Sequence, residues 1–209
     1  MFRTLAATCA ALLLSACTSS ITYRADYLPE IAIPPEARID GRVLVYTTRA
    51  DDERVESEGA TSFTGSGATL VTPVGLITRE VAVKVFSAAA AEGAVHSNEL
   101  TDLGRYSVVV RPEIQDFSYG FPQLKNLGFA ITPEAQVKLR MTVLDAEGRA
   151  VLEKDYDSGV VEGKSYMMSG KPYERVSKLL HDSLYDLMLK AAADVRGHQQ
   201  AATVARPAD

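Results

Sequence analysis

Hydrophobic and polar residues alternate most regularly in residues 136–144, QVKLRMTVL. Side chains of a strand point alternately to its two faces, so the pattern predicts a strand with one apolar and one polar face. The apolar face consists of Val137, Leu139, Met141 and Val143. Residues 145–148, DAEG, favour a turn, and residues 149–159 can return as a second strand. We therefore expect a hairpin that is buried on one face and solvated on the other.

Two further stretches favour strands. Residues 42–48, RVLVYTT, and residues 106–110 are rich in the β-branched and aromatic side chains that strands prefer. Pro112 lacks a backbone donor and therefore indicates a sheet edge or a bulge. Residues 114–121 can continue the strand beyond that point.

Two stretches have helical periodicity. Thr72 can cap a helix that starts at Pro73, and apolar residues then recur at intervals of three or four until Gly93. These residues are Val74, Ile77, Val81, Val85 and Ala88. Residues 172–195 form the stronger helix, whose stripe consists of Tyr173, Val176, Leu180, Leu184, Leu187, Ala191 and Val195. Each pattern predicts an amphipathic helix with one buried face.

The order of these elements is β–α–β–β–β–α. One-sided strands and one-sided helices can bury their apolar faces only against one another. We therefore predict an α/β (α+β) fold, a two-layer sandwich in which two helices cover one face of a small, mainly antiparallel sheet.

The N-terminus has the pattern of a secretory signal. Arg3 supplies a positive charge, and the apolar residues 5–14 follow it almost without interruption. This run is too short to cross a bilayer, which needs about 20 residues. Residues 14–17, LSAC, then place small side chains directly before Cys17. We predict cleavage before Cys17, and the alternatives are an ordinary signal with a chance cysteine and an uncleaved anchor.

The LSAC sequence resembles the lipobox of bacterial lipoproteins. The resemblance implies diacylglycerol on the Cys17 sulfur and a further acyl chain, such as palmitate, on the new amino group. Two or three chains make a lasting anchor, because one chain binds only reversibly. Thr18 stands where an aspartate would retain a proteobacterial lipoprotein in the inner membrane. For a Gram-negative source, this implies the outer membrane, on its periplasmic face.

The remaining chain divides into three parts. Residues 17–40 contain Pro29 and the pair Pro34-Pro35, and we expect them to form a lipidated N-terminus and an extended tether. Residues 41–196 are predicted to form a single α/β domain. The Gln- and Ala-rich residues 197–209 are predicted to be a disordered tail.

The charge and the cysteine content argue against several classes of function. The whole chain has a formal net charge of −5, which argues against nucleic acid as a partner. Cys9 leaves with the signal and Cys17 carries the lipid, so the mature chain retains no thiol for a disulfide, a nucleophile or a metal site. No cofactor is predicted.

The chain resembles the YajG-type outer-membrane lipoproteins. The resemblance rests on the lipobox, the proline-containing segment behind it, and four later stretches. These are Ser107-Val108-Val109-Val110, Asp116-Phe117-Ser118-Tyr119-Gly120, residues 135–145, and Glu162-Gly163 ahead of the last helix. The resemblance implies a small periplasmic accessory lipoprotein and implies no catalytic residues.

Candidate catalytic and metal-binding residues are few. His181, Asp182 and Ser183 are neighbours on one predicted helix and point in different directions, so we expect a solvated helix face and not a triad. His96 is expected in a loop and His198 in the tail. The acidic residues 51–58 favour a loop and lack the ligand order of a calcium site.

The Gly/Ser/Thr-rich residues 61–72 favour a short hairpin or a loop. Within them, Gly65-Ser66-Gly67 begins like a dinucleotide-binding loop, but Leu70 occupies the place of the third glycine. We predict no metal site and no enzymatic activity.

Aromatic residues offer one candidate partner surface. Phe117, Tyr119, Phe121 and Phe129 lie among glycines and prolines, and we expect a mobile loop over residues 120–133. Aromatic side chains contribute strongly to binding when they fill a pocket. The alternative is that these rings close one end of the core.

The favoured function is that of a non-enzymatic accessory or assembly factor of a cell-envelope complex. The expected partners are the membrane, through the lipid, and an envelope protein or a second copy of the chain. The alternatives are a module that binds a lipid or small apolar ligand in envelope transport, and an enzyme such as a cell-wall hydrolase. A large apolar cavity would favour the ligand-binding module, and convergent acid, base or nucleophile groups in a cleft would favour the enzyme.

Overall fold

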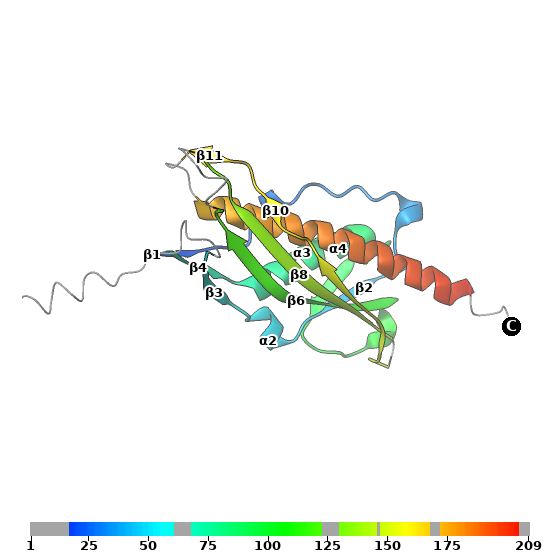
Figure 1. Cartoon of the computed structure of the whole chain (residues 1–209). Coiled ribbons are helices and arrows are strands. Elements are labelled where there is room, and N and C mark those ends of the chain that lie inside the picture. Colours follow the sequence, from blue (N-terminus) through cyan, green and yellow to red (C-terminus); the bar gives the residue numbers. More distant parts are fainter. Residues whose placement is uncertain (1–16, 61–67, 123–129, 146, 168–171, 205–209) are drawn as a thin grey trace, which may run out of the picture.

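The computed structural model describes residues 17–60, 68–122, 130–145, 147–167 and 172–204 (Figure 1). The strands are β1 (Cys17–Ser20), β2 (Val43–Tyr46), β3 (Glu56–Gly59), β4 (Ala68–Thr72), β5 (Ala94–Ser97), β6 (Val108–Gly120), β7 (Ala130–Ile131), β8 (Glu134–Leu144), β9 (Ala150–Asp157), β10 (Val161–Glu162) and β11 (Tyr166–Met167). The α-helices are α2 (Arg49–Asp52), α3 (Val74–Ala89) and α4 (Pro172–Val204), and short 3-10 helices are η1 (Ala25–Tyr27), η2 (Pro35–Ala37) and η3 (Leu103–Arg105).

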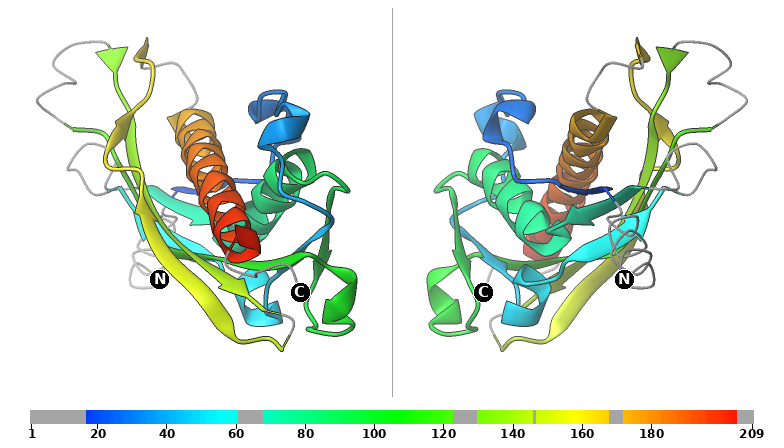
Figure 2. Two further views of the ribbon diagram at one scale, coloured as in Figure 1. Left: turned by 90° about the vertical axis from the view of Figure 1, so that its right-hand side faces the viewer. Right: turned by 90° about the vertical axis from the view of Figure 1, so that its left-hand side faces the viewer.

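The central sheet has the strand order β10-β8-β6-β2-β5, and β9 pairs with β8 on the same edge as β10. Strand β2 is parallel to both β5 and β6, whereas β8 is antiparallel to β6, β9 and β10. Figure 2 shows α3 and α4 next to each other within the curve of this sheet. The predicted α+β two-layer sandwich is therefore confirmed.

The strand predicted from alternation lies at the centre of the core. Its apolar residues Val137, Leu139, Met141 and Val143 are at most 3% exposed. Strand β8 pairs with β6 over most of its length and with β9 on its other edge. On the wet face, Arg140 forms an ion pair across the strands with Asp155 at 2.7 Å.

The two predicted helices exist, with different limits. Helix α3 begins at Val74, because Thr72 belongs to β4 and does not cap the helix. Helix α4 continues through Val204, so the expectation of a disordered tail from residue 197 is wrong for residues 197–204. Gln199 ties this extension to the domain: its side-chain oxygen accepts the Asp40 N–H at 2.9 Å, and its side-chain nitrogen donates to the Asp40 carbonyl at 3.1 Å. Residues 205–209 lie outside the described residues.

Residues 17–40 are not the free tether that their prolines suggested. Strand β1 pairs in parallel with β4, which is also antiparallel to β3. Further along, Ile21, Leu28 and Ile39 are at most 6% exposed. Apolar side chains spaced through this segment pack on the domain, and burying each is worth about 1.5–3 kcal/mol. The segment is therefore part of the folded domain.

Residues 51–58, expected to be a loop, contribute α2 and β3 instead. The Thr48 side chain accepts the Asp51 N–H while the Asp51 carboxylate accepts the Thr48 N–H, which is a capping box. Acidic residues are favourable in a first helical turn, so the composition that suggested a loop stabilises a helix start.

Strand β6 continues through Pro112 because the proline lies beyond the last residue that pairs with β2. Proline has no backbone N–H, and no strand of the described residues pairs with β6 on that edge at this position. This agrees with the predicted sheet edge. A bulge follows between Ile114 and Asp116. There the Arg54 guanidinium donates to the carbonyls of Ile114 and Gln115.

Candidate functional site

The predicted lipidation site is the first of the described residues. Cys17 is the first residue of β1, and its Cα partner is Ala68 in β4. The backbone next to the cysteine is thus held by a neighbouring strand. Any group attached to Cys17 would be joined to the domain without an intervening linker.

The predicted aromatic surface is wrong for three of its four residues. Phe117, Tyr119 and Phe121 are 4%, 3% and 4% exposed, and the Tyr119 ring contacts the other two at the end of β6. The Tyr119 hydroxyl donates to the Glu58 carbonyl at 2.9 Å, and burial raises the pKa of Tyr119 to about 12. The three rings thus belong to the hydrophobic core, and Tyr119 joins that core to β3. Phe129 lies outside the described residues.

His181, expected on a solvated helix face, is fully buried. Its Nδ1 lies 2.7 Å from the Ser177 carbonyl oxygen, so Nδ1 carries the proton and donates. Its Nε2 accepts the backbone N–H of Arg24 at 3.1 Å. The histidine therefore joins α4 to the segment that follows β1.

Two tyrosines of that segment enclose the imidazole. The Tyr23 ring stacks on it with centroids 5.7 Å apart, and the Tyr27 ring meets it edge-on at 5.4 Å. Helix α3 adds a further contact, because Lys84 Nζ donates to the carbonyls of Ala25 and Leu28. The N-terminal segment is thus held against both long helices.

We expect the His181 contact to weaken in acid. Burial lowers the pKa of His181 and outweighs the opposite effects of the Ser177 carbonyl, Asp182 and Asp26, while Lys178 adds to the lowering. The unfolded chain then takes up the proton first, so stability falls as the pH drops below about 6.5, by up to about 1.4 kcal/mol per pH unit. Between pH 7.5 and 5.5, the free energy of unfolding measured in urea should fall less for His181→Phe than for the wild type. An equal dependence of this free energy on pH in the two proteins would contradict the expectation.

The densest polar cluster of the described residues surrounds Asp52, where α2, α3, β2 and β5 meet. The Thr47 hydroxyl donates to Asp52 Oδ1 at 2.6 Å and accepts from His96 Nε2 at 2.7 Å. Arg79 and Asn98 both donate to Asp52 Oδ2, at 3.1 and 2.8 Å. Despite burial, these hydrogen bonds lower the pKa of Asp52, whereas burial lowers the pKa of His96. His96, expected in a loop, lies in β5.

The Asp52 cluster has catalytic residue types, but its hydroxyl is buried. Thr47, the hydroxyl next to the imidazole, is only 2% exposed. The hollow beside it has a volume of about 10 Å³, far below the ~300 Å³ of the smallest usual ligand sites. No group of three or more His, Cys, Asp or Glu side chains able to hold a metal occurs within the described ranges. The cluster therefore joins four elements of the fold.

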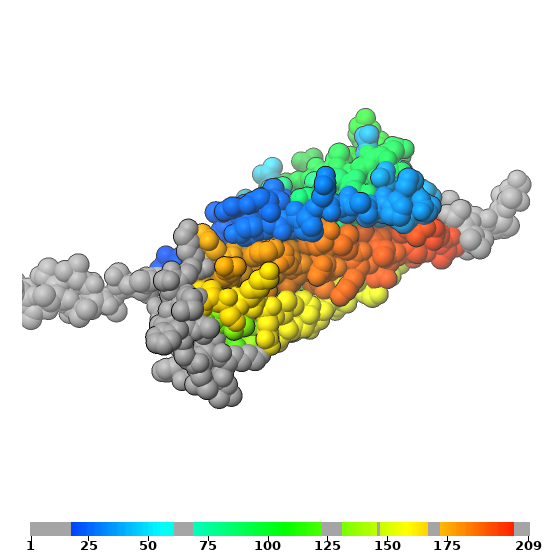
Figure 3. All heavy atoms as spheres, turned by 90° about the horizontal axis from the view of Figure 1, so that it is seen from above, coloured from blue at the N-terminus to red at the C-terminus, as the bar shows by residue number. Residues whose placement is uncertain are grey.

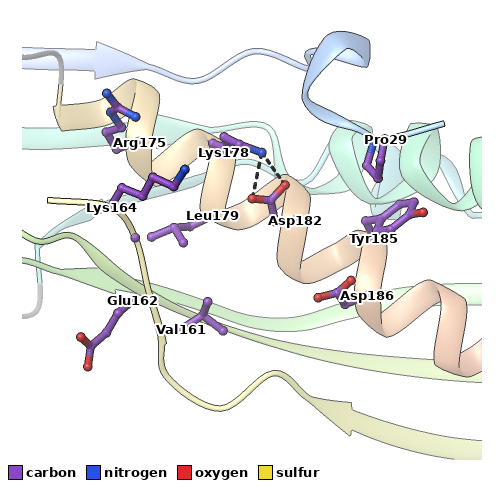
Figure 4. A pocket seen from close by; sticks show the side chains of 11 residues that line it. Pro29, Val161, Glu162, Lys164, Arg175, Lys178, Leu179, Asp182, Tyr185 and Asp186 are labelled. Atoms are coloured by element: carbon purple, nitrogen blue, oxygen red, sulfur yellow. Dashed lines mark hydrogen bonds and ion pairs between the residues drawn. The ribbon is translucent and has the colours of Figure 1, made fainter. Parts of the chain in front are cut away.

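A groove of about 520 Å³ lies along the outer side of α4. Figure 3 shows α4 in orange between the N-terminal segment in blue and strands β9 and β10 in yellow. Figure 4 shows the side chains that line the groove. They come from the N-terminal segment, from β10 with the residues after it, and from α4: Pro29, Val161, Glu162, Gly163, Lys164, Arg175, Lys178, Leu179, Asp182, Tyr185 and Asp186.

Both apolar and charged groups line this groove along its length. Leu179 and Val161 face each other across it, and Pro29 and Tyr185 lie towards one end (Figure 4). Lys164 and Arg175 lie at the other end, while Lys178 pairs with Asp182 at 2.8 Å. The groove thus combines apolar walls with charged groups of both signs, and the two cations Lys164 and Arg175 lie at one end.

This groove could not be predicted from the sequence. One available signal was the spacing of Arg175, Leu179, Asp182 and Asp186, which places them on one face of α4. That face could not be distinguished from an ordinary solvated face, because its opposite wall comes from β10 and from Pro29. His198, expected in the tail, lies on the same helix.

No helix within the described ranges is both long and apolar enough to span a membrane. No protein-family model matches the chain, and no curated protein sequence matches it significantly.

Solved structures are similar to the chain at low sequence identity. A Xanthomonas campestris protein of family DUF330 has a TM-score of 0.52 and 14% identity, over 89% of this chain and 99% of its own. A minor lipoprotein from Acinetobacter baumannii has a TM-score of 0.36 and 10% identity, over 76% and 94% of the two chains. A candidate lipoprotein from Caulobacter crescentus has a TM-score of 0.34 and 15% identity, over 65% and 87%. The Xanthomonas protein shows that this architecture occurs in a solved bacterial protein.

Proposed function

We propose that this protein is a lipid-anchored accessory protein of the bacterial cell envelope, of the YajG type. In this proposal acyl chains on Cys17 attach it to the outer membrane on the periplasmic side. The domain performs no catalysis and instead assists or accompanies an envelope complex. Two features of the sequence support this proposal. They are the lipobox residues 14–17 and the resemblance of the mature chain to YajG-type lipoproteins.

The position of Cys17 is the structural observation on which the proposal depends. Because Cys17 opens β1 and β1 pairs with β4, a lipid on its sulfur would hold the domain directly against the membrane surface. The segment behind it is fastened by His181 and Lys84, so the domain would keep one orientation towards the membrane. A fixed orientation suits a protein that presents one face to a membrane-bound partner.

The arrangement of polar groups supports a non-enzymatic role. The Asp52 cluster, which has the most catalytic residue types, encloses its hydroxyl and lacks a substrate-sized cleft. An enzyme needs a nucleophile or base within hydrogen-bond reach of a bound substrate. A second candidate, a module that binds an apolar ligand, is favoured by one observation, the largely apolar groove along α4.

Replacing Cys17 tests the anchor. Cys17→Ser should abolish lipidation and leave uncleaved precursor, because the enzyme that attaches diacylglycerol needs the thiol. Mass spectrometry of the N-terminal peptide and membrane fractionation would measure this. Cys9→Ser is the matched control and should mature normally. Normal cleavage and membrane attachment of Cys17→Ser would overturn the proposal.

The accessory role has a separate test. Crosslinking in intact envelopes, followed by purification of the chain, should recover a defined set of envelope proteins. Cys17→Ser, which keeps its signal and lacks the lipid, should lose these partners. Recovery of the same partners from this unlipidated precursor would contradict the proposed role of the lipid.

A further inference from the structure

The groove along α4 is built for an amphiphile. Its volume of about 520 Å³ lies within the ~300–1,000 Å³ of small-ligand sites. Leu179 and Val161 form opposite walls, and Pro29 and Tyr185 extend the apolar surface. Such a surface gains free energy when it is covered by hydrocarbon, at about 25 cal/mol per Å².

The cations at one end of the groove form no ion pair within the described residues, although Glu162 also lines the groove two residues before Lys164. Lys164 and Arg175 are exposed, and neither forms an ion pair or a side-chain hydrogen bond within the described part of the chain. Lys178, in contrast, pairs with Asp182 within the groove, and elsewhere on the surface Lys154 and Arg140 pair with nearby carboxylates. A guanidinium and an ammonium at one end of an apolar channel are suited to a phosphate group.

The polarity of the groove matches the orientation of the domain. Arg175 is in the first turn of α4, and the neighbouring Tyr173, Glu174 and Ser177 line a hollow together with Ser20 and Ile21. The cationic end is therefore next to the segment that leaves Cys17, at the same end of the molecule as β1 (Figure 1). If Cys17 is lipidated as proposed, this end faces the membrane.

From these observations we infer that the groove binds one acyl chain of an anionic phospholipid, with its phosphate between Lys164 and Arg175. The chain lies along Leu179 and Val161 towards Tyr185 and Pro29. The acidic Asp186, at the far end, disfavours a headgroup there and so sets the direction of the ligand. This inference depends on the proposed anchor only for the direction in which the groove faces.

Photolabelling with a single-chain lipid tests the inference. The mature protein is purified from membranes in mild detergent and exposed to lysophosphatidylglycerol that carries a diazirine in its acyl chain. Labelled peptides should contain residues 161–164 or 175–186. Competition by unlabelled lysophosphatidylglycerol should exceed that by lysophosphatidylcholine of the same chain length, and glycerol phosphate alone should not compete.

Charge variants provide the decisive comparison. Lys164→Ala with Arg175→Ala should weaken binding of lysophosphatidylglycerol at least about ten-fold, since hydrogen bonds to charged groups contribute about 1.5–3 kcal/mol. The matched control is Arg42→Ala with Arg49→Ala, which removes two exposed arginines outside the groove and should leave binding unchanged.

Three results would overturn the inference: labelling spread over the whole surface, equal competition by the zwitterionic lipid, or equal loss in both double variants. Capture of a protein helix in the groove, without lipid labelling, would also exclude it. The N-terminal peptide of the same preparation reports lipidation of Cys17 independently. Failure of the groove and failure of the anchor are therefore separate outcomes.

Discussion

Leu184→Asp is expected to lower the free energy of unfolding by several kcal/mol. Leu184 is fully buried on the face of α4 that packs against α3 and β8. An aspartate there loses the packing of the leucine, worth about 2–5 kcal/mol, and either buries an unpaired charge or takes up a proton. Urea unfolding followed by far-UV circular dichroism would measure the loss, and the variant should be degraded in the cell.

Asp186→Ala is the control for this substitution. Asp186 is on the same helix two residues away and is exposed on the outer face. We expect its replacement to change stability by less than about 0.5 kcal/mol. If the two variants unfold at the same denaturant concentration, the assignment of the buried face of α4 is wrong.

Gly75→Ala should be destabilising by about 1–3 kcal/mol or more, although it adds a single methyl group. Gly75 lies in the first turn of α3, where α2 approaches so closely that a Cβ atom would be 1.8 Å from the Asp51 carbonyl oxygen. The Gly75 N–H also donates to the Arg54 carbonyl at 3.1 Å. The methyl group would force α2 away and strain the Asp52 cluster. Thermal and urea unfolding would measure the effect.

Gly197→Ala, in α4, is expected to have the opposite effect on stability. A Cβ atom at Gly197 would have no neighbour within 4 Å, and the residue is exposed. Alanine is a better helix former than glycine by about 1 kcal/mol, so this variant should be as stable as the wild type or more stable. A destabilised Gly197→Ala would mean that α4 does not continue as a helix at this point.

Periodicity by itself determined the main elements of this fold. The alternation in residues 136–144 identified the buried face of β8, and the three-and-four spacing identified Leu184 and its neighbours on α4. These patterns repeat over several turns or strand positions, so one ambiguous residue does not change the result. Lipidation at Cys17 is likewise a sequence-level prediction, because the residues of the box are contiguous.

Only the tertiary structure decided where the less periodic segments pack. Pro29 and its neighbours suggested a free tether, but β1 pairs with a strand that lies about fifty residues further along the chain. The Arg24 N–H that donates to His181 is also distant in sequence, as are the Arg79 and Asn98 side chains that donate to Asp52. The burial of His181 and Asp52 could therefore not be read from the local pattern.

The predicted partner surface and the groove show the same limit of prediction from sequence. Phe117, Tyr119 and Phe121 alternate with glycine and polar residues, and whether such rings face solvent or core depends on what covers them. Here all three lie in the hydrophobic core, and Tyr119 bonds to β3. The groove, in contrast, exists because β10 and the N-terminal segment stand on either side of α4. Sequence determines which faces are apolar, but contacts between segments far apart in the chain determine which of those faces remain open to a ligand.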